Sequence, residues 1–322
     1  MKAIKSFIKI PLYGLLILTS VLSLGIPFWW SYPLELLSHF RVYYLLLSGG
    51  LAIAFFLAHL HQQRVRLALL ISLALVVFNG TWIIPWYLPH PQPAAGDLVR
   101  VLAFNINVAN DQWDAIATAV RSVNPDIAVL METSPEATAE LSQRLGNVLP
   151  SVYRTSGGGL TILSRFNLIS PESKQLNGGT ILSTSLQINQ KVVKVVAAHP
   201  IVPVKPNLFH RRNTLLAEIT TDLQQQSQKS LIFLGDLNLT PWSPYYNRFV
   251  RRTKLHNTRL GFGIEPSWIE AATHVRYPRW VTALVKLSID HIFVSSDIQV
   301  VSCTTSKAAN SDHRMLWSDL TL

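Results

Sequence analysis

The chain has 322 residues and a formal net charge of +10, and 49% of its residues are hydrophobic while only 14% are charged. This composition is too apolar for an ordinary soluble protein, so we expect part of the chain to lie in lipid. The single cysteine, Cys303, excludes an intrachain disulfide, so folding must rely on burial.

Three long apolar runs occupy the first 90 residues, at about 10–30, 42–60 and 67–88. Each has roughly the 20 residues needed to cross a hydrocarbon core of about 30 Å. None of them contains Asp, Glu, Lys or Arg. The sequence therefore predicts a membrane domain at 1–90, with three transmembrane helices in the lipid bilayer.

The distribution of Lys and Arg predicts the orientation of this multi-pass region. Lys2, Lys5 and Lys9 precede the first run, and Arg64 and Arg66 lie between the second and the third. Positive charge marks the cytoplasmic side, so we expect a cytoplasmic N-terminus and, after an odd number of crossings, an extracytoplasmic (periplasmic or extracellular) C-terminal part. The first run could instead belong to a cleaved signal peptide, although no convincing small-residue cleavage site follows it.

The remainder of the chain has the pattern of one α/β domain. The Pro-rich segment 91–96 is interpreted as a short stiff linker, and 97–322 is long enough for a sizeable core. Short runs rich in branched residues alternate there with polar helical patterns. Strands are expected at 98–107, 126–132, 160–165, 181–188, 191–199, 230–238, 288–295 and 315–322, and helices at 111–123, 135–145, 207–228 and 243–254.

Polar side chains occur at the ends of many of these expected strands. In a layered α/β fold, strand ends meet along one edge, so residues far apart in the sequence can converge there. We therefore expect the chemistry at that edge. The residues concerned are Asn105, Asn107, Glu132, His199, Asp236, Asn238, Asp290 and the NSDHR sequence at 310–314.

Six short motifs connect these strand ends to a known family. In order along the chain they are FNIN, LMET, AAHP, GDLNLTP, IDHIFVS and SDHR. The set resembles the endonuclease/exonuclease/phosphatase superfamily, which includes DNase I-like nucleases, abasic-site endonucleases, sphingomyelinases and inositol polyphosphate phosphatases. The resemblance covers nearly all of 98–322 and implies a four-layer α/β sandwich, in which two mixed β-sheets pack face to face between helices.

Hydrolysis of a phosphodiester needs an in-line water, neutralised oxygens and a stabilised leaving group, and a hard cation with carboxylate ligands supplies much of that stabilisation. The resemblance implies Mg²⁺, with Mn²⁺ as an alternative. Glu132 is the best candidate ligand, with Asn105 beside it as a carbonyl ligand or an orienting group. Asp312 resembles a further position of the family's metal site.

The catalytic candidates are Asp236, Asn238, His199, Asp290 and His313. Residues i and i+2 of a strand point to the same face, so Asp236 and Asn238 should reach one phosphate. The resemblance implies that Asp236 orients or deprotonates the attacking water and that the Asn238 amide donates to the phosphate. His313, oriented by Asp290, contacts the phosphate or acts as an acid or base. His199 resembles a histidine that donates a proton or hydrogen bond to the phosphate or leaving oxygen.

Alternatives remain at this stage. Asp236 and Asn238 could form only an Asx turn, Glu132 could be only a charge at a helix N-terminus, and His199 could merely end a strand. The preferred hypothesis is a membrane-anchored, nuclease-like phosphoesterase with a phosphodiester substrate and no obligate protein partner. A lipid phosphodiesterase or phosphatase of the sphingomyelinase or phosphoinositide type is the first alternative. A catalytically silent binding or sensor module is the second.

Overall fold

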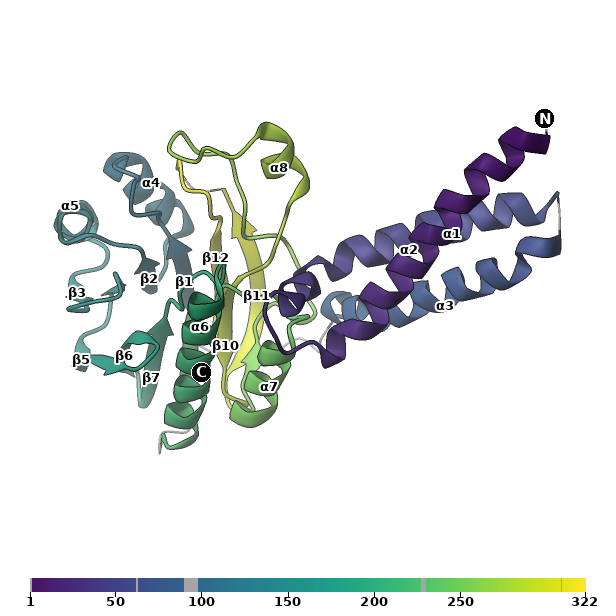
Figure 1. Ribbon diagram of the computed structural model, residues 1–322. Coiled ribbons are helices and arrows are strands. Elements are labelled where there is room, and N and C mark those ends of the chain that lie inside the picture. The colour runs from purple at the N-terminus through teal and green to yellow at the C-terminus, as the bar shows by residue number, and fades with distance from the viewer. Residues whose placement is uncertain (1, 62, 90–97, 227–229, 308) are drawn as a thin grey trace.

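Three long helices form the N-terminal region. The structure is a computed structural model that describes residues 2–61, 63–89, 98–226, 230–307 and 309–322. Figure 1 shows the three helices projecting together from one side of a globular part. They are α1 (Lys2–Gly25), α2 (Arg41–His59) and α3 (Arg66–Ile83), accompanied by the 3-10 turns η1 (Ile26–Phe28), η2 (Leu34–Phe40), η3 (Gln63–Val65) and η4 (Ile84–Tyr87).

By length and composition these helices qualify as membrane spans, over Ile10–Phe28, Leu34–His59 and Arg66–Tyr87. Large apolar side chains such as Ile53 and Leu70 face outward. Polar groups point inward, where the Asn79 amide donates to Ser23 Oγ at 2.9 Å. The interior between the helices also contains apolar residues such as Leu51 and Phe55. Apolar side chains turned outward and polar groups bonded inside are the arrangement expected in lipid, where water does not satisfy polar groups.

Two six-stranded sheets form the globular part (Figure 1). Within each sheet one pair of strands is parallel and the other pairs are antiparallel, so both sheets are mixed. The first sheet has the order β11 (Gln299–Ser306), β12 (Met315–Thr321), β1 (Leu98–Asn105), β2 (Ile127–Met131), β4 (Thr161–Ser164) and β3 (Ser151–Arg154). The second has the order β5 (Leu168–Leu176), β6 (Gly179–Ile188), β7 (Lys191–Ala198), β8 (Leu231–Asp236), β10 (Asp290–Val294) and β9 (His256–Asn257).

Alternation along the strands builds three apolar layers between four structural layers. In β1, Val101 and Ala103 belong to the core between the sheets, whereas Leu102 and Phe104 belong to the core under the outer helices. Helices α4 (Trp113–Val123) and α5 (Pro135–Leu145) cover the first sheet, and α6 (Pro206–Gln224) and α7 (Pro244–Thr253) cover the second. The expected four-layer sandwich is confirmed.

The helical region packs directly on the second sheet's helical layer. Ile83 and Trp86 belong to the same apolar cluster as residues of α6 and α7. The Trp86 carbonyl accepts hydrogen bonds from the amides of Gly261 and Gly263, at 3.0 and 2.7 Å. The predicted linker at 91–96, with the domain boundaries at 90 and 97, lies outside the described residues, so the observed connection is this packing.

Several elements were not expected from the sequence. Strands β3, β5, β9 and β11 and helix α8 (Arg279–Leu284) are additions. All four of these strands lie at the edges of their sheets, where one side of the strand has no neighbouring strand. Their sequences are accordingly polar, as in the half-exposed LISPESKQL of β5, and they lack the apolar run that identifies an inner strand.

Candidate functional site

The topology of the sheets brings the predicted strand ends together. In the first sheet, β1 and β2 are parallel, so Asn105 and the residue after Met131 lie at the same edge. In the second sheet, β10 begins where antiparallel β8 ends, and Asp290 pairs directly with Asp236. The facing sheets thus contribute side chains to one site at this edge.

Asp236 occupies the centre of the group, and it is almost fully buried. Its Oδ2 accepts a hydrogen bond from the Asn105 amide at 3.2 Å. The same oxygen faces Nε2 of His199 at 3.4 Å and Nε2 of His313 at 3.6 Å. A carboxylate held between two imidazoles can orient a water molecule or an acidic ligand group beside them.

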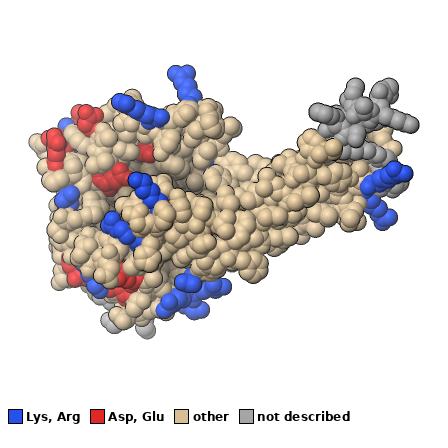
Figure 2. All heavy atoms as spheres, in the orientation of Figure 1, with Lys and Arg blue, Asp and Glu red and all other residues tan. Residues whose placement is uncertain are grey.

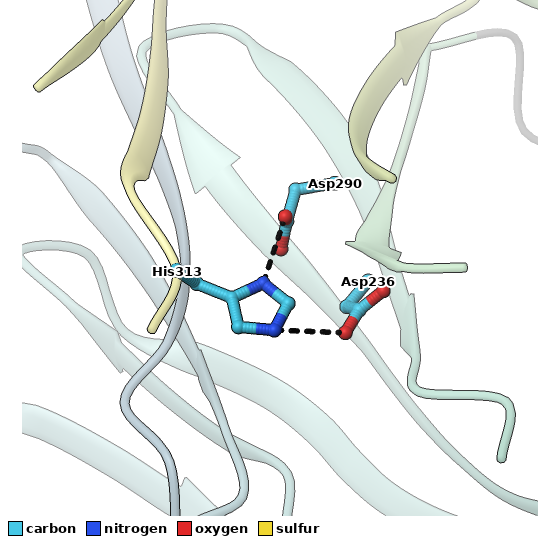
Figure 3. A group of neighbouring side chains, drawn as sticks. All are labelled: Asp236, Asp290 and His313. Carbon is cyan, nitrogen blue, oxygen red and sulfur yellow. Dashed lines mark hydrogen bonds and ion pairs between the residues drawn. The ribbon is translucent and has the colours of Figure 1, made fainter. Parts of the chain in front are cut away.

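His313 lies between two carboxylates, as Figure 3 shows. Its Nδ1 is 3.0 Å from Asp290 Oδ2, which fixes the ring and leaves Nε2 directed at Asp236. The Asp290 backbone amide in turn donates to Ser267 Oγ at 3.1 Å. This is the Asp–His pair expected from the sequence.

The charged side chains of the site shift one another's pKa values. Burial disfavours a charged imidazole, but the carboxylates of Asp290 and Asp236 outweigh it and raise the pKa of His313 to about 10. Burial likewise opposes ionisation of Asp236, yet His313 and His199 lower its pKa to about 2. Asp236 also raises the pKa of His199 against the effect of burial. Burial raises the pKa of Asp290.

Glu132 forms the more open side of the site. It has a left-handed φ of 60°, which is unusual for a residue with a long side chain and is often found where function requires it. Its carboxylate accepts hydrogen bonds from the Asn105 amide at 2.9 Å and the Val108 backbone amide at 3.0 Å, and lies 3.8 Å from Nε2 of His199. With 28% of the side chain exposed, lone pairs remain accessible.

Asp312 joins the site through a neighbouring amide. Asn107 donates from Nδ2 to Asp312 Oδ1 at 2.8 Å, and its own backbone amide donates to Asn105 Oδ1 at 3.0 Å. The other oxygen of Asp312 accepts from the Trp268 indole at 3.1 Å. The chain of contacts therefore runs from Glu132 through the two asparagines to Asp312.

Asn238 departs from the sequence argument. Strand β8 ends at Asp236, and Asn238 has a left-handed φ of 51°, so the two residues do not share a strand face. Instead the Asn238 backbone amide donates to Asp236 Oδ1 at 2.9 Å, an Asx turn, and its carboxamide donates to the Pro200 carbonyl at 3.0 Å. Asn238 is close to the site, but its amide points at the backbone.

Two sets of donors bear on metal binding. Asp236, Asp290 and His313 place ligand atoms within 4.8 Å of one another. That set fits a cation poorly, because the imidazole already bridges the two carboxylates and its raised pKa keeps it protonated. The partly exposed carboxylate of Glu132 fits a hard cation better, since Mg²⁺ binds through one or two carboxylates and keeps several waters. Asn105 turns its NH₂ group toward Glu132 and so orients this carboxylate.

Trp268 and Ser267 were missed by the sequence analysis. Trp268 holds Asp312 and forms a backbone bridge to His313, and Ser267 accepts from the amides of Ile289 and Asp290. Both lie in an irregular segment, where no strand pattern or family motif marks them. An isolated Trp beside Ser and Glu was the only available signal.

Comparisons with known proteins agree with this geometry. The model of the endonuclease/exonuclease/phosphatase family matches residues 102–313. The chain belongs to this family. A search of curated proteins finds no match.

Several solved structures share the fold of this chain. An endonuclease/exonuclease/phosphatase from Beutenbergia cavernae is 19% identical with a TM-score of 0.57, covering 70% of this chain and 72% of its own. TDP2 of D. rerio, solved with a single-strand DNA product, is 14% identical with a TM-score of 0.57, covering 70% and 100%. Sphingomyelinase C from Streptomyces griseocarneus is 13% identical with a TM-score of 0.52, covering 69% and 99%.

Proposed function

We propose that this chain is a membrane-anchored, divalent-metal-dependent phosphoesterase that hydrolyses phosphodiester bonds. Its first candidate substrate is nucleic acid, as in a nuclease. The observation that carries the proposal is Asp236 Oδ2, which lies within 3.6 Å of both imidazoles and accepts from Asn105. One carboxylate beside two imidazoles, whose pKa values the neighbouring carboxylates raise, suits a reaction in which a water attacks an anionic phosphorus centre.

Asp236 orients the attacking water and accepts its hydrogen bond. His199 and His313, both with raised pKa values, present N–H groups to the phosphate and offset its negative charge. Asp290 holds the His313 ring in position. Asn238 shapes the turn that fixes the Asp236 carboxylate, a smaller role than direct contact with phosphate.

Glu132 is the proposed principal ligand of Mg²⁺ or Mn²⁺, and Asn105 orients its carboxylate. Asp312 is the proposed further acidic residue of the metal site, and Asn107 connects it to Asn105. The bound cation supplies positive charge to the phosphoryl oxygens and the leaving group. Asn105 also contacts Asp236, so one amide ties the metal side of the site to the catalytic side.

The proposed orientation places the catalytic domain outside the cytoplasm. The turn between α1 and α2 contacts the catalytic domain, because Glu35 pairs with Arg212 at 2.9 Å. In Figure 2 the helical projection is nearly free of charged side chains along its length and has Lys and Arg at the end remote from the domain. Positive charge at that end supports a cytoplasmic location for it.

A lipid head group is the second candidate substrate, and helix α8 favours it. All six residues of α8, RWVTAL, are described and none is buried, with Trp280 65% and Leu284 63% exposed. The Leu284 carbonyl accepts from the hydroxyl of Tyr43 in the first turn of α2. Trp268, which contacts Asp312, lies in the same connection between β9 and β10, residues 258–289. This connection therefore joins the site to the end of α2 nearest the domain, and Figure 1 shows α8 on the half of the domain nearest the helices.

Hydrolysis measured side by side on plasmid DNA, sphingomyelin vesicles and phosphoinositide vesicles, with Mg²⁺ and the full-length chain, tests the proposal. We expect DNA to be cleaved fastest and Asp236→Asn to abolish the reaction. A strong preference for one lipid would replace the nuclease-like substrate by the second candidate. Turnover of none of the three would contradict the phosphodiesterase proposal and favour a silent binding module.

A further inference from the structure

A buried ion pair joins the membrane region to the loop that follows Asp236. Glu35 lies in η2, between the first two membrane helices, and Arg212 lies in the middle of α6. Arg212 Nη2 is 2.9 Å from Glu35 Oε2, and both side chains are completely inaccessible to solvent. Burial of two opposite charges is costly unless both are well bonded, so such a pair needs an explanation.

The pair is bonded mainly to one short loop, residues 237–243. Arg212 Nη1 donates to the Asn238 carbonyl at 3.0 Å. The second oxygen of Glu35 accepts from the hydroxyl of Ser243, the N-cap of α7. Arg212 and Glu35 therefore hold both ends of this loop.

His39 of η2 holds the middle of the same loop. The Thr240 backbone amide donates to His39 Nδ1 at 3.3 Å, and the Thr240 hydroxyl lies 3.0 Å from that nitrogen. Glu35 and His39 are four residues apart in η2, so one short turn of the membrane region supplies both groups. Thus η2 bonds the 237–243 loop directly at Thr240 and Ser243, and it bonds the loop at Asn238 through Arg212.

The loop in turn sets the carboxylate of Asp236. The Asn238 amide donates to Asp236 Oδ1, while the carbonyl of the same residue accepts from Arg212. Asp236 Oδ2 is then left for Asn105, His199 and His313. A shift of Asn238 would rotate the carboxylate away from these partners.

We propose that Glu35 is a positioning residue for the catalytic site: through Arg212 it fixes the 237–243 loop and so the Asp236 carboxylate. The membrane region is then a structural part of the active site, and not only an anchor. This inference rests on the proposed function, because it assigns Glu35 a part in the orientation of the water-binding carboxylate.

The test uses the full-length chain in nanodiscs with Glu35→Gln, Arg212→Met and the double variant. Tyr245→Phe is the matched control, because it removes another hydrogen bond across the same junction, from the Tyr245 hydroxyl to the Trp30 carbonyl, without touching the 237–243 loop. If Glu35→Gln does not fold, Glu35→Asp replaces it. The shorter side chain keeps the negative charge but moves it away from Arg212 and Ser243. The kinetic constants refer to folded protein isolated by gel filtration.

We expect Glu35→Gln to lower kcat about tenfold with KM changed less than about twofold, since displacement of a catalytic group acts on the reaction more than on binding. Tyr245→Phe should leave both constants unchanged. In the Arg212→Met background, Glu35→Gln should have no further effect, because residues that act through one another are not additive. Equal losses in Glu35→Gln and Tyr245→Phe, or independent effects of Glu35 and Arg212, would overturn the proposal.

Amide hydrogen exchange separates this inference from the proposed function. Glu35→Gln should accelerate exchange in a peptide covering 237–243, and Tyr245→Phe should not. If the wild type hydrolyses no phosphodiester, the proposed function fails and exchange alone decides whether Glu35 holds the loop. Unchanged exchange in Glu35→Gln overturns the positioning role in either case.

Discussion

The helical region and the globular domain both have apolar interiors, but they differ in what they expose and in where polar side chains are buried. In the helices, polar groups such as Asn79 and Ser23 face inward and Ile53 is 64% exposed. In the domain, the cores between layers are apolar. Buried polar groups therefore take different parts in the two regions. Between the helices, Asn79 and Ser23 bond one helix to another, whereas among the apolar strands Asp236, Asp290 and His313 gather at the candidate site.

The candidate site shows this difference most clearly. Asp236, Asp290 and His313 are all buried, although the strands around them are apolar. Each of them pairs with another member of the group, which offsets the cost of burying it. Substitutions in each region test whether the two follow separate rules.

Loss of Asp236 should have the largest effect. Asp236→Asn keeps the volume but removes the charge that faces both imidazoles, so we expect hydrolysis to fall by about 10³-fold, within the range of lost acid–base groups. Steady-state kinetics on a phosphodiester measures it. Asp319→Asn is the control, since Asp319 pairs with Arg100 on β1 of the first sheet and contacts no predicted site residue. A similar loss in Asp319→Asn would show general damage.

A charge on the outer face of the membrane helices should have the next largest effect. Ile53→Arg places a guanidinium at a position facing lipid, at a cost of about 3 kcal/mol for insertion. The fraction of protein recovered in the membrane measures it. Leu98→Arg is the matched control, because Leu98 is similarly exposed, at 57%, but lies at the start of β1. Normal membrane recovery of Ile53→Arg would contradict the spanning role of α2.

Glu132→Gln should weaken the binding of Mg²⁺ more than it affects the fold. Loss of this partly exposed carboxylate should raise the Mg²⁺ concentration for half-maximal activity by about 10–100-fold, with activity recovered at saturating Mg²⁺. A Mg²⁺ titration of the reaction measures it. Glu136→Gln, an exposed glutamate in the first turn of α5, should titrate like the wild type. An unchanged Mg²⁺ requirement in Glu132→Gln would exclude Glu132 as the principal ligand.

His291 should make the domain sensitive to acid. Burial lowers the pKa of His291 from 6.5 to about 3, although the hydrogen bond from the ring to the Leu239 carbonyl acts to raise this pKa. The folded pKa lies below the unfolded one, so its stabilising contribution is present above pH 6.5 and is lost as pH falls toward 3. Between pH 6.5 and pH 5 the loss is about 2 kcal/mol. Chemical unfolding of the wild type and His291→Gln at both pH values measures it, and equal pH dependence would contradict the assignment.

The sequence predicted the inner strands and the convergence of their ends, because apolar runs and family motifs both mark them. For Asn238 the sequence left two geometries open, a shared strand face with Asp236 and an Asx turn, and the structure has the turn, because the strand ends at Asp236 and Asn238 takes a left-handed conformation. Edge strands such as β5 have no apolar signal. Trp268 belongs to no motif.

The Glu35–Arg212 pair was equally invisible in the sequence. The two residues lie 177 positions apart in segments read separately, one by hydropathy and the other by motif. Only the packing of η2 against α6 brings them together.

The most direct measurement is metal-dependent release of p-nitrophenolate from bis(p-nitrophenyl) phosphate by the purified full-length chain. We expect release in Mg²⁺, its loss on chelation with EDTA, its return when Mg²⁺ is added back, and none from Asp236→Asn. Release that persists in EDTA, or equal release from Asp236→Asn, would contradict the assembly of these strand ends into a metal-dependent phosphoesterase site.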